Sequence, residues 1–226
     1  KYVEAQIELF ESETHEEVPQ ELQQEIRDML MLHPDHTRVH YLSYLYYAQH
    51  GDWEQAERSL RHYFDTYQSF DGTGSAYQYA LLNLAILNIR FGLVTEARKV
   101  LEEAKDMARD SRDNICLLYL ASWEKRLELG KPTILPLPSS ENARSVDNLG
   151  RDLEALSIQA VRERAPQVQA LTELQIAMKH IGSGKCPTFV FEALAKATAL
   201  CYCFDLKLQA SIALAVANAW HTYGKQ

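Results

Sequence analysis

The residues from 76 to 107 predict two antiparallel helices joined by a tight turn at Gly92. The second helix is amphipathic, because small and apolar residues recur at helical spacing on one side and charged residues fill the other. The first helix is apolar on every side and is interrupted only by Asn83, Asn88 and Arg90. Such a helix needs cover on opposite sides, which limits the fold to layered helices. Its apolar residues are Leu81, Leu82, Leu84, Ala85, Ile86, Leu87 and Ile89.

The same pattern occurs once before, in a segment that aligns when Gly51 is placed on Gly92. A glycine turn followed by a small residue early in the next helix is typical of tetratricopeptide repeats. The spacing of 41 residues exceeds the usual repeat of about 34, and we place the excess in the Gly-rich segment 69–75. Two unrelated helix pairs would be the alternative, but five further positions align. They pair Ala56 with Ala97, Leu60 with Leu101, Tyr63 with Ala104, Tyr44 with Ala85, and Tyr47 with Asn88.

The whole chain predicts an all-α fold, an α-solenoid of antiparallel helix pairs resembling a tetratricopeptide superhelix. Prolines and glycines place further helices at about 2–10, 19–32, 113–129, 146–164, 166–181, 187–204 and 205–223. The predicted domains are an N-terminal helical pair (1–34), clear repeats (35–129), a Pro-rich loop (130–146) and degenerate helix pairs (147–226). The chain begins at Lys1 without a methionine, so we expect a segment of a longer protein. The last helix is too apolar for a terminal cap, so further repeats or a partner should cover it.

Composition excludes several classes of function. The formal net charge is −8, and no Lys/Arg-rich patch is present, which disfavours nucleic-acid binding. No run is long enough for a membrane span, and no secretory signal is present. The four cysteines lack the spacing of a disulfide framework, so we expect inert thiols in a reducing intracellular compartment.

Three histidines lie near one predicted helix start and could form a zinc site: His33, His36 and His40. His36 and His40 share a helix face, and Asp35 could supply a carboxylate. The simpler interpretation assigns them to a helix start, an exposed position and a helix interface, and we favour it. We therefore expect no metal site.

No other motif supports catalysis. The segment 182–185 resembles the end of a phosphate-binding loop, but Lys179 occupies the position where that motif needs glycine, and a helix rather than a strand precedes it. It therefore predicts the end of a helix. We expect no catalytic residue, no cofactor and no small-molecule ligand.

The remaining candidate is the concave surface that the first helices of the repeats would line. Peptide-carboxylate clamps place Lys, Asn and Arg there. The first repeat instead has Tyr41 and Leu45, and only Asn83 matches, so no clamp is predicted. An apolar groove indicates a permanently covered surface, occupied by another subunit or by the chain itself, although tight self-packing is almost as good an interpretation. The candidate partner-binding residues are Arg38, Tyr41, Leu45, Gln49, Tyr79, Leu82, Ile86, Ile89 and Arg90.

These residues resemble one known family, anaphase-promoting complex subunit 5. The resemblance is specific over about 38–127 and looser over 150–225, and it breaks at the Pro-rich loop. The segments that carry it are His40–Leu45, Leu60–Asp65, Ala80–Gly92, Ala97–Ala104, Cys116–Leu117 with Ser122–Trp123, and Ala219–Trp220 with Tyr223–Gly224.

The resemblance implies a non-catalytic platform subunit of a large cullin-RING-type ubiquitin ligase that controls the cell cycle. It also implies contacts with the first, fourth and small fifteenth subunits of that complex, in the nucleus and cytoplasm. The alternative is a free-standing tetratricopeptide adaptor that binds short peptide motifs.

Overall fold

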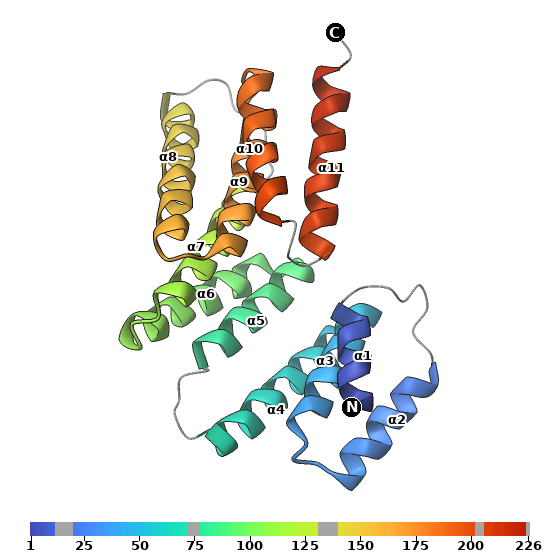
Figure 1. Ribbon diagram of the computed structural model, residues 1–226. Coiled ribbons are helices and arrows are strands. Elements are labelled where there is room, and N and C mark those ends of the chain that lie inside the picture. The colour runs from blue at the N-terminus through green and yellow to red at the C-terminus, as the bar shows by residue number, and fades with distance from the viewer. Residues whose placement is uncertain (12–19, 72–76, 131–139, 202–205, 225–226) are drawn as a thin grey trace. The chain divides into compact units, whose positions relative to one another are not determined.

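The computed structural model describes residues 1–11, 20–71, 77–130, 140–201 and 206–224, and all secondary structure in these ranges is helical. The chain forms two compact units, Lys1–Arg112 and Asp113–Gln226. Figure 1 labels the helices of both units. The predicted all-α fold of antiparallel helix pairs is confirmed.

The first unit contains two consecutive helical hairpins, α3 with α4 and α5 with α6, and α4 packs against α5. Helices α1 and α2 both pack on α3, where Phe10, Leu22 and Ile26 join Leu42 in one buried cluster. The bounds are α1 (Tyr2–Glu11), α2 (Gln20–Leu32), α3 (Thr37–His50), α4 (Trp53–Asp71), α5 (Tyr77–Arg90) and α6 (Val94–Asp110).

The second unit is built around α9, which contacts all four other helices of the unit. Its core consists mainly of aliphatic residues of α9 and α10, with Leu153 and Ile212 contributed by the flanking helices. No described helix of either unit combines the length and apolarity needed to cross a bilayer. The bounds are α7 (Asn114–Leu129), α8 (Ser140–Arg162), α9 (Pro166–Gly182), α10 (Pro187–Cys201) and α11 (Leu206–Tyr223).

The two aligned turns have the same geometry. Gly51 and Gly92 both have left-handed backbone conformations, with φ of 80° and 75°. The Asp52 amide donates to the Tyr47 carbonyl at 3.0 Å, and the equivalent Leu93 amide donates to the Asn88 carbonyl at 2.8 Å. This six-residue hydrogen bond closes a helix end that glycine favours.

The small residues after these turns serve the predicted steric role. Ala56 and Ala97 are both fully buried, at 0% exposure. Each lies early in the second helix of its hairpin, where a larger side chain would push the two helices apart. The two aligned repeats therefore have the same backbone geometry at the turn and the same packing of the small residue.

The same turn continues in the second unit, where the sequence pattern had become degenerate. Arg164 has φ of 55°, and the Ala165 amide donates to the Ala160 carbonyl at 2.9 Å. The turn after α9 repeats this geometry at Gly184, with φ of 64°. Arginine can replace glycine because its side chain remains exposed, so only backbone strain opposes the left-handed conformation. The turn type therefore persists without its usual residue.

Three predicted boundaries differ from the structure. Helix α4 continues through Asp71, so residues 69–71 of the predicted Gly-rich loop are helical. Helix α8 begins at Ser140 rather than near Val146, because residues 140–149 contain neither proline nor glycine to stop it. The sequence predicts Pro34 as the start of the first repeat's first helix, whereas α3 begins at Thr37, after a turn.

Some predictions lie outside the described residues. These are the acidic loop 12–17, the rest of the Gly-rich loop, the Pro-rich stretch 131–139 and Cys203. The predicted domain boundaries at 34, 129 and 146 follow the repeat pattern rather than compactness, and they stay predictions.

Candidate interaction surface

The candidate residues of α3 differ in their surroundings: some contact α1 and α2, and others are exposed to solvent. Arg38 forms an ion pair with Glu4 of α1, and Leu45 packs against the buried cluster that α1 and α2 build on α3. Gln49 is exposed near the end of the helix. Part of this side of α3 is thus already covered by the chain itself.

The candidate residues of α5 differ in exposure. Leu82 is buried, with 6% of its surface exposed, whereas Ile86 and Ile89 are half-buried. Tyr79 is also half-buried, and Arg90 at the helix end is exposed. The surfaces that sequence reasoning assigned to a partner therefore remain partly open at Ile86 and Ile89, and their binding role remains a prediction.

Three half-buried tyrosines form a continuous aromatic row across the first hairpin. The ring centroid of Tyr41 lies 5.2 Å from that of Tyr63 on α4 and 5.8 Å from that of Tyr44 on α3. We call these three residues the tyrosine row. Such spacing is typical of favourable aromatic contacts.

The row has an arginine near each end. Burial raises the pKa of Tyr63, and the positive charge of Arg38 opposes that rise. Burial likewise raises the pKa of Tyr44, and the charge of Arg90 opposes it. The two guanidinium groups therefore act electrostatically on opposite ends of the row.

Neither α3 nor α5 contains a single Asp or Glu residue. In the described part of the first unit the acidic residues lie on the other helices and in the turns, at Asp35 and Asp52, and several exposed carboxylates pair with their own helix neighbours. Examples are Glu54 with Arg58, Glu57 with Arg61 and Asp106 with Arg109. Helices α3 and α5 therefore contribute no carboxylate of their own in a chain whose net charge is −8, and Glu4 of α1 supplies the one that pairs with Arg38.

A hydrogen bond between the repeats was missed by sequence reasoning. Trp53 at the start of α4 donates its indole N–H to the Asn88 side-chain oxygen of α5 at 3.0 Å. Asn88 is only 3% exposed, so this bond satisfies a buried amide oxygen in an apolar helix. A polar residue near the end of an otherwise apolar helix was the available signal.

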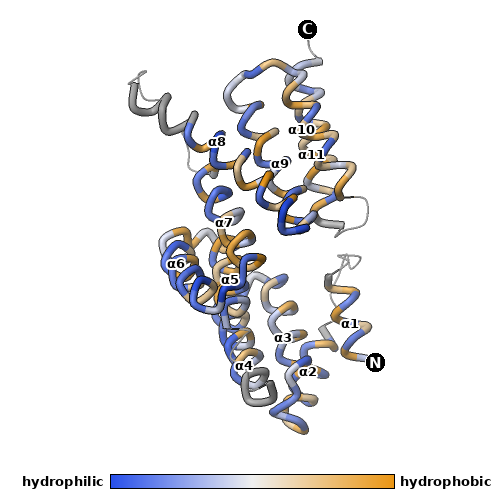
Figure 2. Tube along the Cα trace, turned by 60° about the vertical axis from the view of Figure 1, so that its left-hand side comes forward, coloured by the Kyte–Doolittle hydropathy of each residue, from blue (hydrophilic) through white to orange (hydrophobic). Residues whose placement is uncertain are grey.

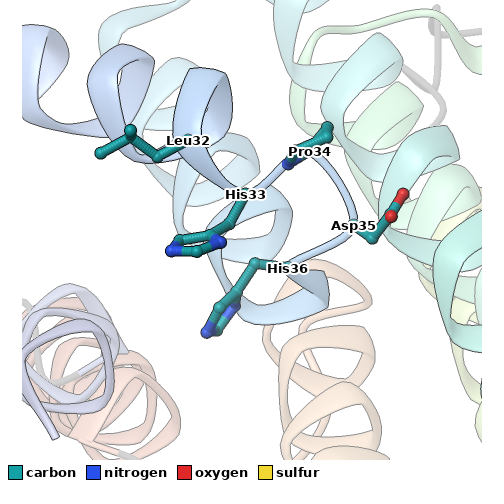
Figure 3. Close-up of a pocket in the computed structure, with 5 residues that line it drawn as sticks. All are labelled: Leu32, His33, Pro34, Asp35 and His36. Atoms are coloured by element: carbon teal, nitrogen blue, oxygen red, sulfur yellow. The ribbon is translucent and has the colours of Figure 1, made fainter.

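The histidines of the α2–α3 turn do not converge on one point. His33 and His36 line a shallow pocket of about 480 Å³, and in Figure 3 the Asp35 carboxylate points to the opposite side of the turn. His40 lies elsewhere, with Nε2 at 2.7 Å from the Pro34 carbonyl oxygen and its ring 5.6 Å from that of His62. Among the described residues, no three His, Cys, Asp or Glu side chains gather as metal ligands would.

The segment 182–185 ends helix α9, as its sequence predicted. The Ser183 amide donates to the Lys179 carbonyl at 2.9 Å, and the Lys185 amide donates to the His180 carbonyl at 3.1 Å. Gly184 supplies the left-handed residue of this helix end.

Helix α9 also carries buried polar side chains that sequence reasoning missed. Ser157 donates to the Glu173 carboxylate at 2.7 Å, and the Gln175 amide donates to the Ser122 carbonyl at 3.1 Å. Burial lowers the pKa of His180, and Nδ1 of its ring has no hydrogen-bond partner among the described residues. These contacts specify how α9 packs between its neighbours.

The last helix leaves large apolar side chains exposed. Leu214 is 75% exposed and Trp220 62% exposed, with the Trp220 ring 4.8 Å from that of Phe191 on α10. Figure 2 shows apolar residues recurring along α10 and α11. The expectation that further repeats or a partner cover α11 stays a prediction.

Comparison with known proteins connects these features to one family. The family model for anaphase-promoting complex subunit 5 matches residues 40–130, which span most of α3 and continue through α7. The resemblance to that family is confirmed. The subunit 5 from Mus musculus is 29% identical over 227 residues, which cover 96% of this chain and 29% of the relative.

Two further subunit 5 proteins extend the comparison. The one from Homo sapiens is 37% identical over 124 residues, covering 51% of this chain and 16% of the relative. The one from Schizosaccharomyces pombe is 31% identical over 184 residues, covering 81% and 24%. The chain therefore spans less than a third of the length of these curated relatives. The match to subunit 5 includes both aligned repeats and the tyrosine row.

Proposed function

We propose that this chain is a tetratricopeptide-like segment of a subunit of the anaphase-promoting complex, and that it serves as a scaffold. The observation that carries the proposal is the coincidence of the family match, residues 40–130, with the two repeats whose turns are equivalent. Stacked helical repeats offer extended surfaces for protein partners. Half-buried Ile86 and Ile89 on α5 support such a role, as do exposed Leu214 and Trp220 on α11.

In this proposal the segment takes no part in the transfer of ubiquitin. Its contribution is to hold neighbouring subunits in position within a cullin-RING-type ubiquitin ligase that acts in cell-cycle control. The proposed partners are the first, fourth and small fifteenth subunits, and the proposed location is the nucleus and cytoplasm. No nucleic acid, membrane, cofactor or small molecule is part of the proposal.

The test is capture of separately purified complex subunits by this chain, with and without Ile86→Asp. A carboxylate at a half-buried position of α5 would have to be desolvated on partner binding, which costs about 1–3 kcal/mol or more. We expect Ile86→Asp to lose capture by roughly tenfold or more, since about 1.4 kcal/mol is a factor of ten in affinity.

The matched control is Glu102→Lys, which changes charge on the exposed side of α6 and should leave capture intact. Equal capture by both variants would contradict the assignment of α5 to an interface. Circular dichroism of each variant separates lost binding from lost folding.

A free-standing adaptor for short peptide motifs is the second candidate, because arginines and tyrosine hydroxyls on α3 and α5 could anchor a peptide. Binding to isolated peptides with no capture of any complex subunit would favour it over the scaffold.

A further inference from the structure

The tyrosine row and its neighbouring helices have three properties that together indicate which kind of ligand would bind there. It presents half-buried aromatic faces, it has Arg38 and Arg90 acting on its two ends, and the helices α3 and α5 beside it contain no carboxylate. A surface with positive charge favours a partner that supplies negative charge.

One end of the row already holds such a group. Glu4 of α1 forms an ion pair with Arg38, so the chain itself places a carboxylate beside the Tyr63 end. At the other end Arg90 is exposed, and no described carboxylate forms an ion pair with it. The pairing seen at Arg38 thus shows the kind of group that Arg90 lacks.

We propose that the surface formed by Arg38, the tyrosine row and Arg90 docks a short acidic segment of a partner protein. Carboxylates of that segment pair with the two arginines, and its aliphatic side chains pack on the tyrosine rings. This inference rests on the proposed function only in that the chain acts by binding other proteins. It goes further by naming the chemistry of the segment that binds.

The size of the surface sets the length of the segment. Helices α3 and α5 each have 14 residues, or about 21 Å at 1.5 Å per residue. An extended chain rises about 3.3 Å per residue, so about seven residues span the same length. An extended peptide of this size therefore matches the length of either helix.

The probe is a fluorescein-labelled peptide of about ten residues in which Asp, Glu and Leu alternate, titrated with the full chain and followed by anisotropy. A peptide with Lys and Arg in place of the acidic residues is the charge control. We expect the acidic peptide alone to bind, and more weakly at about 1 M salt than at about 0.1 M, because the Debye length falls from about 10 Å to about 3 Å.

Arg90→Glu should weaken binding of the acidic peptide about tenfold or more, since a charge-assisted hydrogen bond becomes a repulsion. The matched control is Arg109→Glu, which makes the same charge change at an exposed position of α6 that pairs with Asp106. Equal weakening by the two variants would show a non-specific charge effect and overturn the site.

Glu4→Gln gives an independent test at the other end of the row. Removing the carboxylate that occupies Arg38 should tighten binding of the acidic peptide, and an unchanged affinity would overturn the role of Arg38. If the acidic peptide bound with no higher affinity than the basic peptide, the proposal as a whole would be overturned.

The result of the peptide-binding test can be distinguished from the result of the subunit-capture test of the proposed function. Capture of complex subunits without binding of the acidic peptide would overturn this inference alone. Binding of the peptide without capture of any subunit would count against the scaffold alone.

Discussion

The equivalent turns at Gly92 and Arg164 allow one test of backbone strain. Adding a Cβ atom at Gly92 should lower the free energy of unfolding, and removing one at Arg164 should raise it. Gly92 has φ of 75°, and a Cβ atom built there would meet nothing within 4 Å, so Gly92→Ala adds backbone strain and no clash. The left-handed conformation costs a residue with a Cβ atom about 1–2 kcal/mol. Alanine recovers about 0.4–1 kcal/mol by restricting the unfolded chain. The net expected loss is about 1 kcal/mol.

Arg164 occupies the equivalent turn between α8 and α9 with φ of 55°, so Arg164→Gly should relieve the strain that Gly92→Ala creates. The gain of about 1–2 kcal/mol is offset by about 0.5–1 kcal/mol for the freedom of glycine in the unfolded chain. We expect a net stabilisation of about 0.5–1 kcal/mol.

The assay is urea denaturation followed by far-UV circular dichroism, with thermal melting as a second measure. For a chain of this size, 1 kcal/mol corresponds to a shift of about 2–4 °C in Tm. The control is Gly182→Ala, because Gly182 lies in α9 without a positive φ and its added Cβ would also meet nothing within 4 Å. That variant should be stabilised by about 0.5–1 kcal/mol. The strain argument would be refuted if Gly92→Ala and Gly182→Ala had the same free energy of unfolding. It would also be refuted if Arg164→Gly were less stable than the unchanged chain.

Further predictions follow from single groups. Trp53→Phe removes the hydrogen bond to the buried Asn88 side-chain oxygen and should cost about 1–3 kcal/mol in urea denaturation. A loss that persists unchanged when Asn88 is also replaced by Leu would contradict this. Cys186 is exposed and its hydrogen bond with Thr188 lowers its pKa, whereas burial and a nearby aspartate raise the pKa of Cys116 to about 12. Iodoacetamide near neutral pH should therefore modify Cys186, in contrast to the inert thiols expected from the sequence, and spare Cys116. Peptide mapping that finds the reverse order would count against the packing of α7. The pKa of His180 is lowered in the folded state, so stability should fall as the pH drops below 6.5, its ordinary pKa. His180→Gln should reduce that fall, and an identical pH profile in the variant would exclude His180 as its source.

The sequence predicted most helices because their signals are local. Glycine at 51 and 92 provides the left-handed residue of a helix end, and Pro166 and Pro187 mark helix starts, so the corresponding bounds agree closely with the structure. The start of α8 was wrong by about six residues because the end of a Pro-rich stretch is a weaker signal than its beginning. The sequence located the turn before Pro166, but not its left-handed conformation, because a left-handed arginine has no distinguishing sequence pattern.

For the candidate surface, too, some features follow from the local sequence pattern and others only from tertiary packing. The sequence by itself determined that α5 is apolar on all sides and that α3 and α5 occupy equivalent positions in two repeats. Only the tertiary structure decided that Glu4 covers Arg38 and that Tyr63 of α4 joins Tyr41 and Tyr44 in one row. The physical reason is that periodicity records which side of a helix a residue occupies, whereas a contact between helices depends on how closely and at what height they pack.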